Sequence, residues 1–272
     1  MKLGLSSYTY TWGVGVPGHP PDRPLSALML VHRAIELGVP LVQFADNLPL
    51  HQFTAADVAA IESDAREAGL EIEVGTRGIG EHLHRYLQLA NVFGSPFVRI
   101  VLDAGRDQPS PSEAAERLKA FEPAFRQARV RLAIENHDRF TTTQLVGLVE
   151  ALGDWVGICL DTANSLGSME TPGAVVAALG PHAINLHLKD FTIRRHSHQM
   201  GFEIEGTPAG SGLLDIPWLL ETLSSNADLR SAILELWTPP ESTIEATIAK
   251  EVEWANTSLA YLRGIPTLEF TK

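Results

Sequence analysis

The chain has 272 residues, of which 44% are hydrophobic, and this length is enough for one large α/β barrel or two small domains. Its formal net charge of −12 argues against a broad nucleic-acid surface, because nucleic-acid binding depends on basic patches. Since no apolar run approaches a membrane span, no signal-peptide pattern is present and Cys159 is the only cysteine, we expect a cytoplasmic protein without an internal disulfide.

Apolar runs bounded by turn residues alternate with segments of helical periodicity along the chain. In chain order, the predicted elements are strand 2–10, helix 25–37, strand 41–45, helix 55–68, strand 70–75, helix 80–93, strand 96–102, helix 113–127, strand 131–135, helix 142–152, strand 156–161, helix 173–179, strand 183–188, helix 216–224, strand 232–237 and helix 242–262. Eight such units of about 34 residues are typical of a (β/α)8 TIM barrel. An open doubly wound sheet is the competing architecture, but Gly13-x-Gly15 lacks the third glycine of its phosphate-binding turn. We therefore predict a single TIM-barrel domain over residues 1–272.

Proline and glycine modify this pattern at several points. Pro123 should kink or break the helix at 113–127, for which Ser112 is the expected N-cap. Residues 12–24 are rich in Gly and Pro and predict a loop long enough to act as a lid. Residues 189–212 predict a long polar loop after the seventh strand. We expect these two loops to determine specificity.

Four of the predicted strands end at, or close to, residue types that bind metals: Glu135, Asp161, His187 and Glu235. The C-terminal ends of the strands form the active-site mouth of a (β/α)8 barrel, so these side chains should meet there. Three carboxylates and one imidazole suit one divalent cation, Mn²⁺, Mg²⁺, Co²⁺ or Zn²⁺. The cation would also offset the repulsion between the carboxylates. Taken singly, each residue could instead be a helix cap or a surface residue.

Further polar residues follow the same strand ends. His137 could hydrogen-bond substrate or cap the next helical region. Lys189 could hold a carboxylate or an oxyanion, with Asp190 orienting it, or these two residues could form a surface ion pair. Several basic residues crowd the loop after strand seven, and Arg195 is our candidate among them for contact with an anionic or hydroxylated substrate.

Arg99 stands inside the fourth predicted strand, between Val98 and Ile100. A charge buried in a strand needs a partner of opposite charge. Asp103 is the candidate partner, and such a pair could be purely structural.

The motifs at the strand ends resemble those of the xylose isomerase-like TIM-barrel proteins, the sugar phosphate isomerase/epimerase group. The matching features are Ile134-Glu135-Asn136-His137, Leu160-Asp161-Thr162, Asn185-Leu186-His187-Leu188-Lys189-Asp190, Gly210-x-Gly212-x-x-Asp215 and Leu234-Glu235-Leu236. The resemblance implies that Glu135, Asp161, His187 and Glu235 bind the metal. It also implies that Glu135 and Glu235 act as an acid/base pair that moves a proton through an enediolate.

One position departs from that resemblance. Epimerases and isomerases of this group usually carry His three residues after the metal-binding Asp, where this chain has Asn164. Asn can hydrogen-bond substrate but cannot accept a proton at neutral pH. Residues 135–140, 161–167 and 187–191 are similar to a decarboxylase branch that acts on branched 3-oxo sugar acids such as 3-oxo-isoapionate. In that chemistry the metal serves as the electron sink, and Lys189 or an Arg of the following loop could hold the carboxylate.

We therefore expect a metal-dependent isomerase or epimerase that forms an enediolate from a small polyhydroxylated carbonyl substrate in carbohydrate catabolism. The first alternative is a carboxy-lyase of a branched 3-oxo sugar acid, and the second is a non-catalytic metabolite-binding barrel. Endonuclease action on abasic DNA is disfavoured by the charge of −12. The expected partner is a small sugar or sugar acid, with no nucleic acid and no membrane, and a homodimer is left open because related barrels often dimerise.

Overall fold

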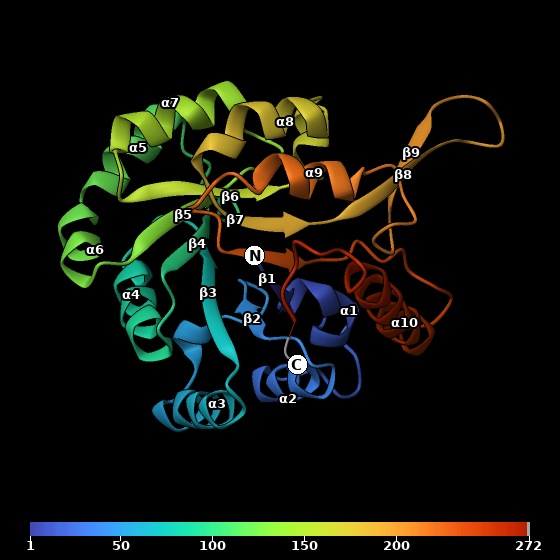
Figure 1. Cartoon of the computed structure of the whole chain (residues 1–272), viewed down its shortest axis with the longest axis horizontal. Helices are drawn as coiled ribbons and strands as arrows, with labels where there is room; N and C mark the ends of the chain where they lie inside the picture. Colours follow the sequence, from blue (N-terminus) through green and yellow to red (C-terminus); the bar gives the residue numbers. More distant parts are fainter. Residues whose placement is uncertain (271–272) are drawn as a thin grey trace.

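Eight parallel strands close into a barrel in the computed structural model, which describes residues 1–270 (Figure 1). The strands are β1 (Lys2–Ser6), β2 (Leu41–Phe44), β3 (Glu71–Arg77), β4 (Phe97–Val101), β5 (Arg131–Glu135), β6 (Val156–Asp161), β7 (Ala183–Leu188) and β10 (Ser231–Leu234). Each strand pairs with the next barrel strand along the chain, and β10 pairs with β1 to complete the ring. The predicted (β/α)8 barrel is therefore confirmed.

Helices surround the barrel and cover the outer face of its strands (Figure 1). They are α2 (Ala27–Glu36), α3 (Ala55–Ala68), α4 (His82–Phe93), α5 (Pro111–Lys119), α6 (Glu122–Ala128), α7 (Thr142–Leu152), α8 (Pro172–Leu179), α9 (Ile216–Leu223) and α10 (Ile244–Leu262). Local sequence sets their ends, as α3 illustrates. The Thr54 side chain accepts a hydrogen bond from the backbone N–H of Asp57, and Gly69 ends the helix with φ 66°. Within residues 1–270, no helix has the length and apolarity needed to cross a membrane.

The predicted helix at 113–127 is divided into α5 and α6. Pro123 lies in the first turn of α6, where its missing N–H costs nothing, so the expected break is confirmed. The N-cap of α5 is Ser110, which accepts from the backbone N–H of Glu113, and the choice of Ser112 was wrong. Ser110 precedes Pro111, a residue favoured at the first helical position.

The first strand is shorter than predicted. It stops at Ser6, whose side chain accepts a hydrogen bond from the N–H of Tyr8 and begins a 3-10 helix, η1 (Ser7–Tyr10). A short helix, α1 (Thr11–Val14), follows within the segment predicted as a Gly- and Pro-rich loop. The carboxylate of Glu251 on α10 accepts from the N–H groups of Trp12 and Gly13 at 3.0 Å each, so this segment is held against the last helix.

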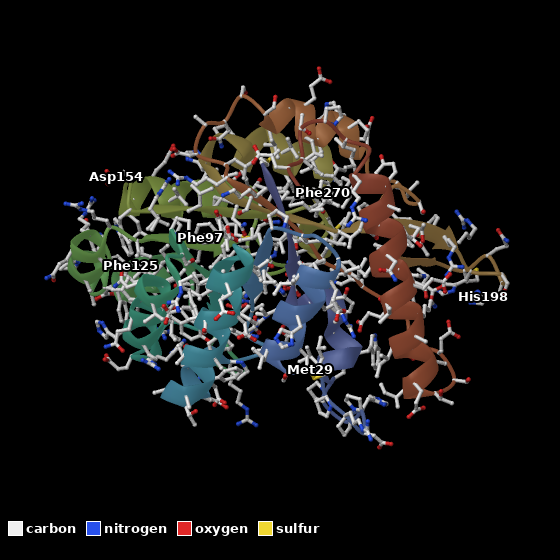
Figure 2. The ribbon with its side chains drawn as sticks, turned by 60° about the horizontal axis from the view of Figure 1, so that its bottom comes forward. Met29, Phe97, Phe125, Asp154, His198 and Phe270 are labelled. Atoms are coloured by element: carbon white, nitrogen blue, oxygen red, sulfur yellow. The ribbon has the colours of Figure 1, made fainter. Side chains whose placement is uncertain are left out.

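The segment predicted as a polar loop at 189–212 is largely a hairpin, and that prediction was wrong. Strands β8 (Asp190–Arg195) and β9 (Phe202–Thr207) pair antiparallel, with Ile193 opposite Ile204. The hairpin projects away from the barrel (Figure 1), and Figure 2 shows His198 at its tip. Its aromatic and β-branched residues, Phe191, Thr192, Ile193, Phe202 and Ile204, suit a strand ladder.

Candidate metal centre

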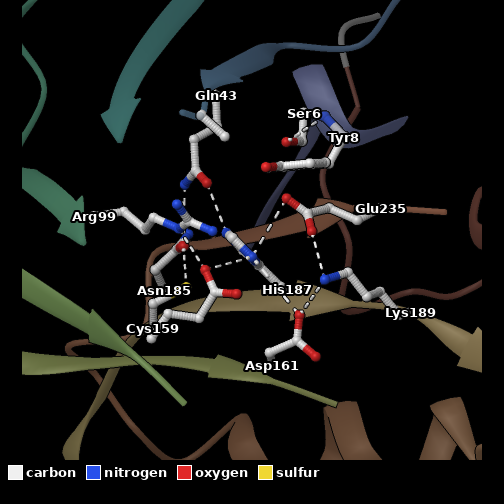
Figure 3. A network of polar contacts seen from close by, with 12 residues as sticks. Ser6, Tyr8, Gln43, Arg99, Cys159, Asp161, Asn185, His187, Lys189 and Glu235 are labelled. Atoms are coloured by element: carbon white, nitrogen blue, oxygen red, sulfur yellow. Dashed lines mark hydrogen bonds and ion pairs between the residues drawn. The ribbon is translucent and has the colours of Figure 1, made fainter. Parts of the chain in front are cut away.

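The four residues expected to bind a metal come together at the C-terminal mouth of the barrel. Figure 3 shows three of them, Asp161, His187 and Glu235. Glu135 and Asp161 are the last residues of β5 and β6, His187 lies near the end of β7, and Glu235 directly follows β10. The Nδ1 atom of His187 lies 3.3 Å from Oε2 of Glu135, 3.4 Å from Oε1 of Glu235 and 3.9 Å from Oδ2 of Asp161. All four side chains are buried.

The donor atoms of this cluster fit a bound cation. Nδ1 of His187 and Oε1 of Glu235 are buried without a hydrogen-bond partner within the part of the chain that the structure describes. Buried polar atoms normally have a hydrogen-bond partner. Potential ligand atoms that lack one and converge on one point therefore favour a bound ion there. Single ligand atoms of Asp161, His187 and Glu235 lie within 4.8 Å of one another. Carboxylate oxygens with one imidazole nitrogen suit Mg²⁺, Mn²⁺, Co²⁺ or Zn²⁺.

Cys159 lies next to the cluster but does not fit as a ligand. Its Sγ donates a hydrogen bond to Oδ1 of Asn185 at 3.0 Å. Burial, and then the negative charge of Glu135, raise the pKa of the thiol well above its usual value. Since thiolate rather than thiol binds metals, the carboxylates and His187 are the better ligand set.

Lys189 points its ammonium group at the same carboxylates. Nζ lies 2.8 Å from Oδ2 of Asp161 and 2.8 Å from Oε2 of Glu235. Burial alone would lower the pKa of Lys189, but the charges of Asp161 and Glu235 outweigh it and raise that pKa, so the side chain stays cationic. Lys189 is thus a fixed positive charge beside the ligand atoms.

Asp190 neither orients Lys189 nor forms a surface ion pair with it. Its buried carboxylate accepts hydrogen bonds from the backbone N–H groups of Gly210, Gly212 and Leu214, at 2.9, 2.9 and 3.1 Å. A side chain at Gly212 would overlap the Asp190 carboxylate, which explains the glycine there. Asp190 therefore fixes the return of the chain from the hairpin toward α9.

The predicted partner of Arg99 was wrong. Arg99 donates from Nε to Oε2 of Glu135 and from Nη1 to Oδ1 of Asp46, the latter at 2.8 Å. Asp103 instead accepts two hydrogen bonds of 2.8 Å from Arg139. Burial raises the pKa of Glu135, but the positive charges beside it, Arg99 foremost, lower it to about 2. Arg99 therefore keeps this carboxylate ionised inside the barrel.

Sequence reasoning missed three residues of the site: Tyr8, Asp46 and Arg77. Asp46 accepts hydrogen bonds from Nε of Arg77 at 2.9 Å and from the hydroxyl of Tyr8 at 3.1 Å. Burial opposes ionisation of Asp46, but Arg99 and Arg77 hold its pKa well below the usual range. The available signal was position, because Asp46 and Arg77 lie just after β2 and at the end of β3.

A cavity of about 740 Å³ opens above the cluster. Its lining includes the buried Glu135 and Glu235, together with Lys189, Asn164 and His137, and aromatic residues such as Trp12 and the partly exposed Trp237. This volume suits a small metabolite, and the mix of polar groups with aromatic walls is usual for such sites.

Comparison with known proteins places this geometry in a family. The family described as "Xylose isomerase-like TIM barrel" matches residues 31–263. The chain belongs to the xylose isomerase-like TIM-barrel family. It is 30% identical over 266 residues to 3-oxo-isoapionate decarboxylase of Pectobacterium atrosepticum, with 96% of this chain and 95% of that protein covered.

Solved structures of the family share this fold at low sequence identity. D-psicose 3-epimerase of Clostridium cellulolyticum H10, solved with D-tagatose, has a TM-score of 0.70 and 14% identity, covering 97% of this chain and 98% of its own. A xylose isomerase-like TIM-barrel protein of Mycobacterium smegmatis in complex with magnesium has a TM-score of 0.65 and 14% identity, covering 96% and 97%. At this identity the likeness shows the fold alone.

The remaining predicted substrate-binding residues differ in position. Asn164 is buried and donates from Nδ2 to Oε1 of Glu135 at 2.8 Å, so it lies within the site of this family member. His137 lines the cavity and contacts the carboxylate of Asp138 through Nδ1. Arg195 lies on the exposed hairpin, 4.5 Å over the ring of Phe202, and the structure does not bring it to the cavity. Arg195 was expected in a loop over the barrel mouth. It lies instead in β8, and this strand runs outward, away from the mouth (Figure 1).

Proposed function

We propose that this chain is a divalent-metal-dependent carboxy-lyase that removes CO2 from a branched 3-oxo sugar acid. The observation that carries the proposal is the buried ammonium of Lys189 in the cavity wall, 2.8 Å from two carboxylates of the candidate ligand set. A cation at that point can hold the carboxylate of a substrate beside the metal. The 30% identity to a 3-oxo-isoapionate decarboxylase over almost the whole chain supports the same substrate class.

The charge of the site also supports an anionic substrate. The carboxylates of Glu135, Asp161, Glu235 and Asp46 are opposed by the cations Arg99, Lys189 and Arg77. With a divalent ion added, this paired group would carry five positive charges against four negative ones. A site with a positive surplus attracts a carboxylate more strongly than a neutral sugar.

Glu135, Asp161, His187 and Glu235 would hold the ion, Mn²⁺, Mg²⁺, Co²⁺ or Zn²⁺. When bound, such a cation polarises the ketone of the substrate and stabilises the negative charge that develops next to it. Arg99 keeps Glu135 ionised and in place for this role.

The reaction itself needs one bond to break and one proton to be returned. The bond between the carboxylate carbon and the α-carbon breaks, CO2 leaves, and its electron pair stays with the substrate as an enolate. A proton then adds to the α-carbon, so no oxidant or reductant is required. The proton comes from water, and we assign its relay to the α-carbon to Glu235, because Oε1 of Glu235 is unpaired among the described residues, whereas both oxygens of Glu135 accept from Arg99 and Asn164.

Isomerisation or epimerisation of a ketose is the second candidate. The carboxylates of Glu135 and Glu235 both line the cavity, at 3.3 and 3.4 Å from the same His187 nitrogen, as a two-base proton transfer would need. Asn164 stands against it, because this residue cannot accept the proton that a histidine could.

The deciding experiment compares wild type with Glu135→Gln, His187→Ala and Lys189→Met. We expect about one divalent ion per chain in wild type after reconstitution with Mn²⁺, and none in the first two variants. The loaded wild type should release CO2 from 3-oxo-isoapionate, and Lys189→Met should keep the metal but lose most of that activity. Carbon-bound deuterium exchange with ketoses in heavy water, without CO2 release from the sugar acid, would favour the isomerase. Metal binding with neither activity would favour a metabolite-binding barrel.

A further inference from the structure

A layer of polar residues fills the barrel interior close to the candidate metal centre (Figure 3). It consists of Gln43 on β2, Glu73 on β3, Asn185 on β7 and Ser231 on β10, and all four are buried. Since β2 and β7 are not neighbours in the barrel, the hydrogen bond of 3.0 Å between Gln43 and Asn185 crosses the interior. Branched apolar residues usually occupy this space, and a buried polar network is costly unless fully paired.

The network meets the candidate metal ligands at His187. Nε2 of His187 lies 2.6 Å from Oε1 of Gln43. An amide oxygen only accepts, so Nε2 of His187 must carry a proton. Nδ1 is then the nitrogen that faces the carboxylates of Glu135 and Glu235, and it is the one whose lone pair is available to a metal ion.

This arrangement holds only while the Gln43 amide keeps its direction. Its Nε2 donates to Oε2 of Glu73 at 2.9 Å. A reversed amide would point its oxygen at the Glu73 carboxylate and its NH2 group at His187. Nε2 of His187 would then have to accept, the proton would move to Nδ1, and the lone pair would no longer face the carboxylates.

Glu73 is held in place as an acceptor. Oε1 accepts from the hydroxyl of Ser231 at 2.6 Å, and that hydroxyl accepts from Nδ2 of Asn185 at 2.8 Å. No cationic side chain among the described residues forms an ion pair with Glu73. Burial raises the pKa of Glu73 to about 7, and a proton taken up at Oε1, beside Ser231, leaves Oε2 an acceptor for Gln43. Glu73 itself touches neither the ligands nor the cavity above them.

We propose that Glu73 is a positioning residue that acts through Gln43 to hold His187 as its Nε2–H tautomer. Glu73 fixes the direction of the amide, the amide fixes the proton on His187, and Nδ1 is thereby presented for metal binding. This inference rests on the proposed metal-binding role of His187, but its first readout needs no metal.

The test is the substitution Glu73→Gln, which keeps the shape of the side chain but can donate as well as accept. Long-range ¹H–¹⁵N spectra of the imidazoles in metal-free protein, recorded at a pH where the His187 ring is neutral, report the tautomer, with the His187 signals assigned by comparison with His187→Ala. Wild type should show Nε2–H alone, and Glu73→Gln should show a mixture of tautomers. The affinity for Mn²⁺ should fall about 10- to 100-fold, the usual effect of changing an outer partner of a ligand.

The exchange variant Gln43→Glu/Glu73→Gln provides the rescue. It puts an acceptor-only carboxylate opposite His187 and an amide donor where Glu73 stood. We expect a single Nε2–H tautomer and most of the wild-type affinity for Mn²⁺. If Glu73→Gln alone does not fold, the double variant still tests the role of Glu73. A mixture of His187 tautomers in the double variant would overturn the proposal.

Glu71→Gln is the matched control, since Glu71 lies on the same strand but is exposed and paired with Lys2. It should match wild type in tautomer and in affinity. A folded Glu73→Gln with His187 entirely in the Nε2–H form and unchanged Mn²⁺ affinity would overturn the inference. A wild type that shows the Nε2–H tautomer but binds no metal would instead refute the proposed function.

Discussion

Nδ2 of Asn164 lies 2.8 Å from Oε1 of Glu135 and joins the 3-10 helix η3 (Asn164–Ser168) to the end of β5. Arg99 donates to the other oxygen of the same carboxylate. Both oxygens of Glu135 therefore have fixed donors, and the orientation of this candidate ligand is decided by two residues distant from it in sequence.

Replacing Asn164 should disturb Glu135 without removing it. In Asn164→Asp the donor is lost and a second carboxylate faces Glu135, so we expect CO2 release from the sugar acid to fall about 10- to 100-fold. Asn164→Ala, which only loses the donor, should fall less. Asn47→Ala is the control, because Asn47 hydrogen-bonds to Ser7 outside the cavity lining. Equal rates in all three variants would show that the contact has no role in turnover.

Arg99 should be essential for stability. Arg99→Met leaves the buried carboxylates of Glu135 and Asp46 without this cation, and we expect the free energy of unfolding to drop by about 3–5 kcal/mol. Urea unfolding measures the change. The control is Arg126→Met, which removes exposed ion pairs with Glu122 and Asp154 and should leave stability unchanged within error. If both variants unfold alike, the buried cluster does not depend on its guanidinium.

The Asp190 carboxylate should control the rigidity of the segment after the hairpin. Asp190→Ala removes the acceptor for the N–H groups of Gly210, Gly212 and Leu214. We expect the hydrogen exchange of these three amides to accelerate at least about tenfold, in line with the loss of one or more buried hydrogen bonds. Asp215→Ala removes the N-cap of α9 and should speed exchange at Trp218 instead. Unchanged protection in Asp190→Ala would mean that another group fixes the segment.

Glu251 should give the stability a pH dependence. Burial raises its pKa to about 7, although the N–H groups of Trp12 and Gly13 oppose this shift. The pKa of Glu251 in the folded chain therefore lies above its value of about 4.3 in the unfolded chain. The contribution of Glu251 to stability is fully present below about pH 4.3 and is lost as the pH rises through about 7. Between pH 5 and pH 8, wild type should therefore lose up to about 3 kcal/mol more stability than Glu251→Gln.

Urea unfolding at the two pH values gives this difference. Glu253→Gln, an exposed change two residues along α10, should keep the wild-type dependence. If Glu251→Gln and wild type lose the same stability between pH 5 and pH 8, Glu251 is ionised without penalty in the fold.

The sequence by itself determined the barrel and the position of the candidate ligands. Hydrophobic periodicity, helix caps and turn glycines are local signals, and they predicted the alternation of strands and helices. Barrel geometry then brings the ends of all strands to one mouth, so Glu135, Asp161, His187 and Glu235 could be placed together without knowing any side-chain contact. Local signals failed at residues 189–212, where many polar residues predicted a loop but the chain forms the hairpin of β8 and β9.

Only the tertiary structure decided which side chains pair inside the barrel. The nearest carboxylate in sequence to Arg99 was Asp103, but Arg99 reaches Glu135 on the neighbouring strand β5 and Asp46 just after β2, two strands away. Glu73 likewise reaches His187 only through Gln43, across strands far apart in the chain. These partners depend on how far side chains extend across the closed barrel and on which atoms remain unpaired there, and no local pattern in the sequence records either quantity.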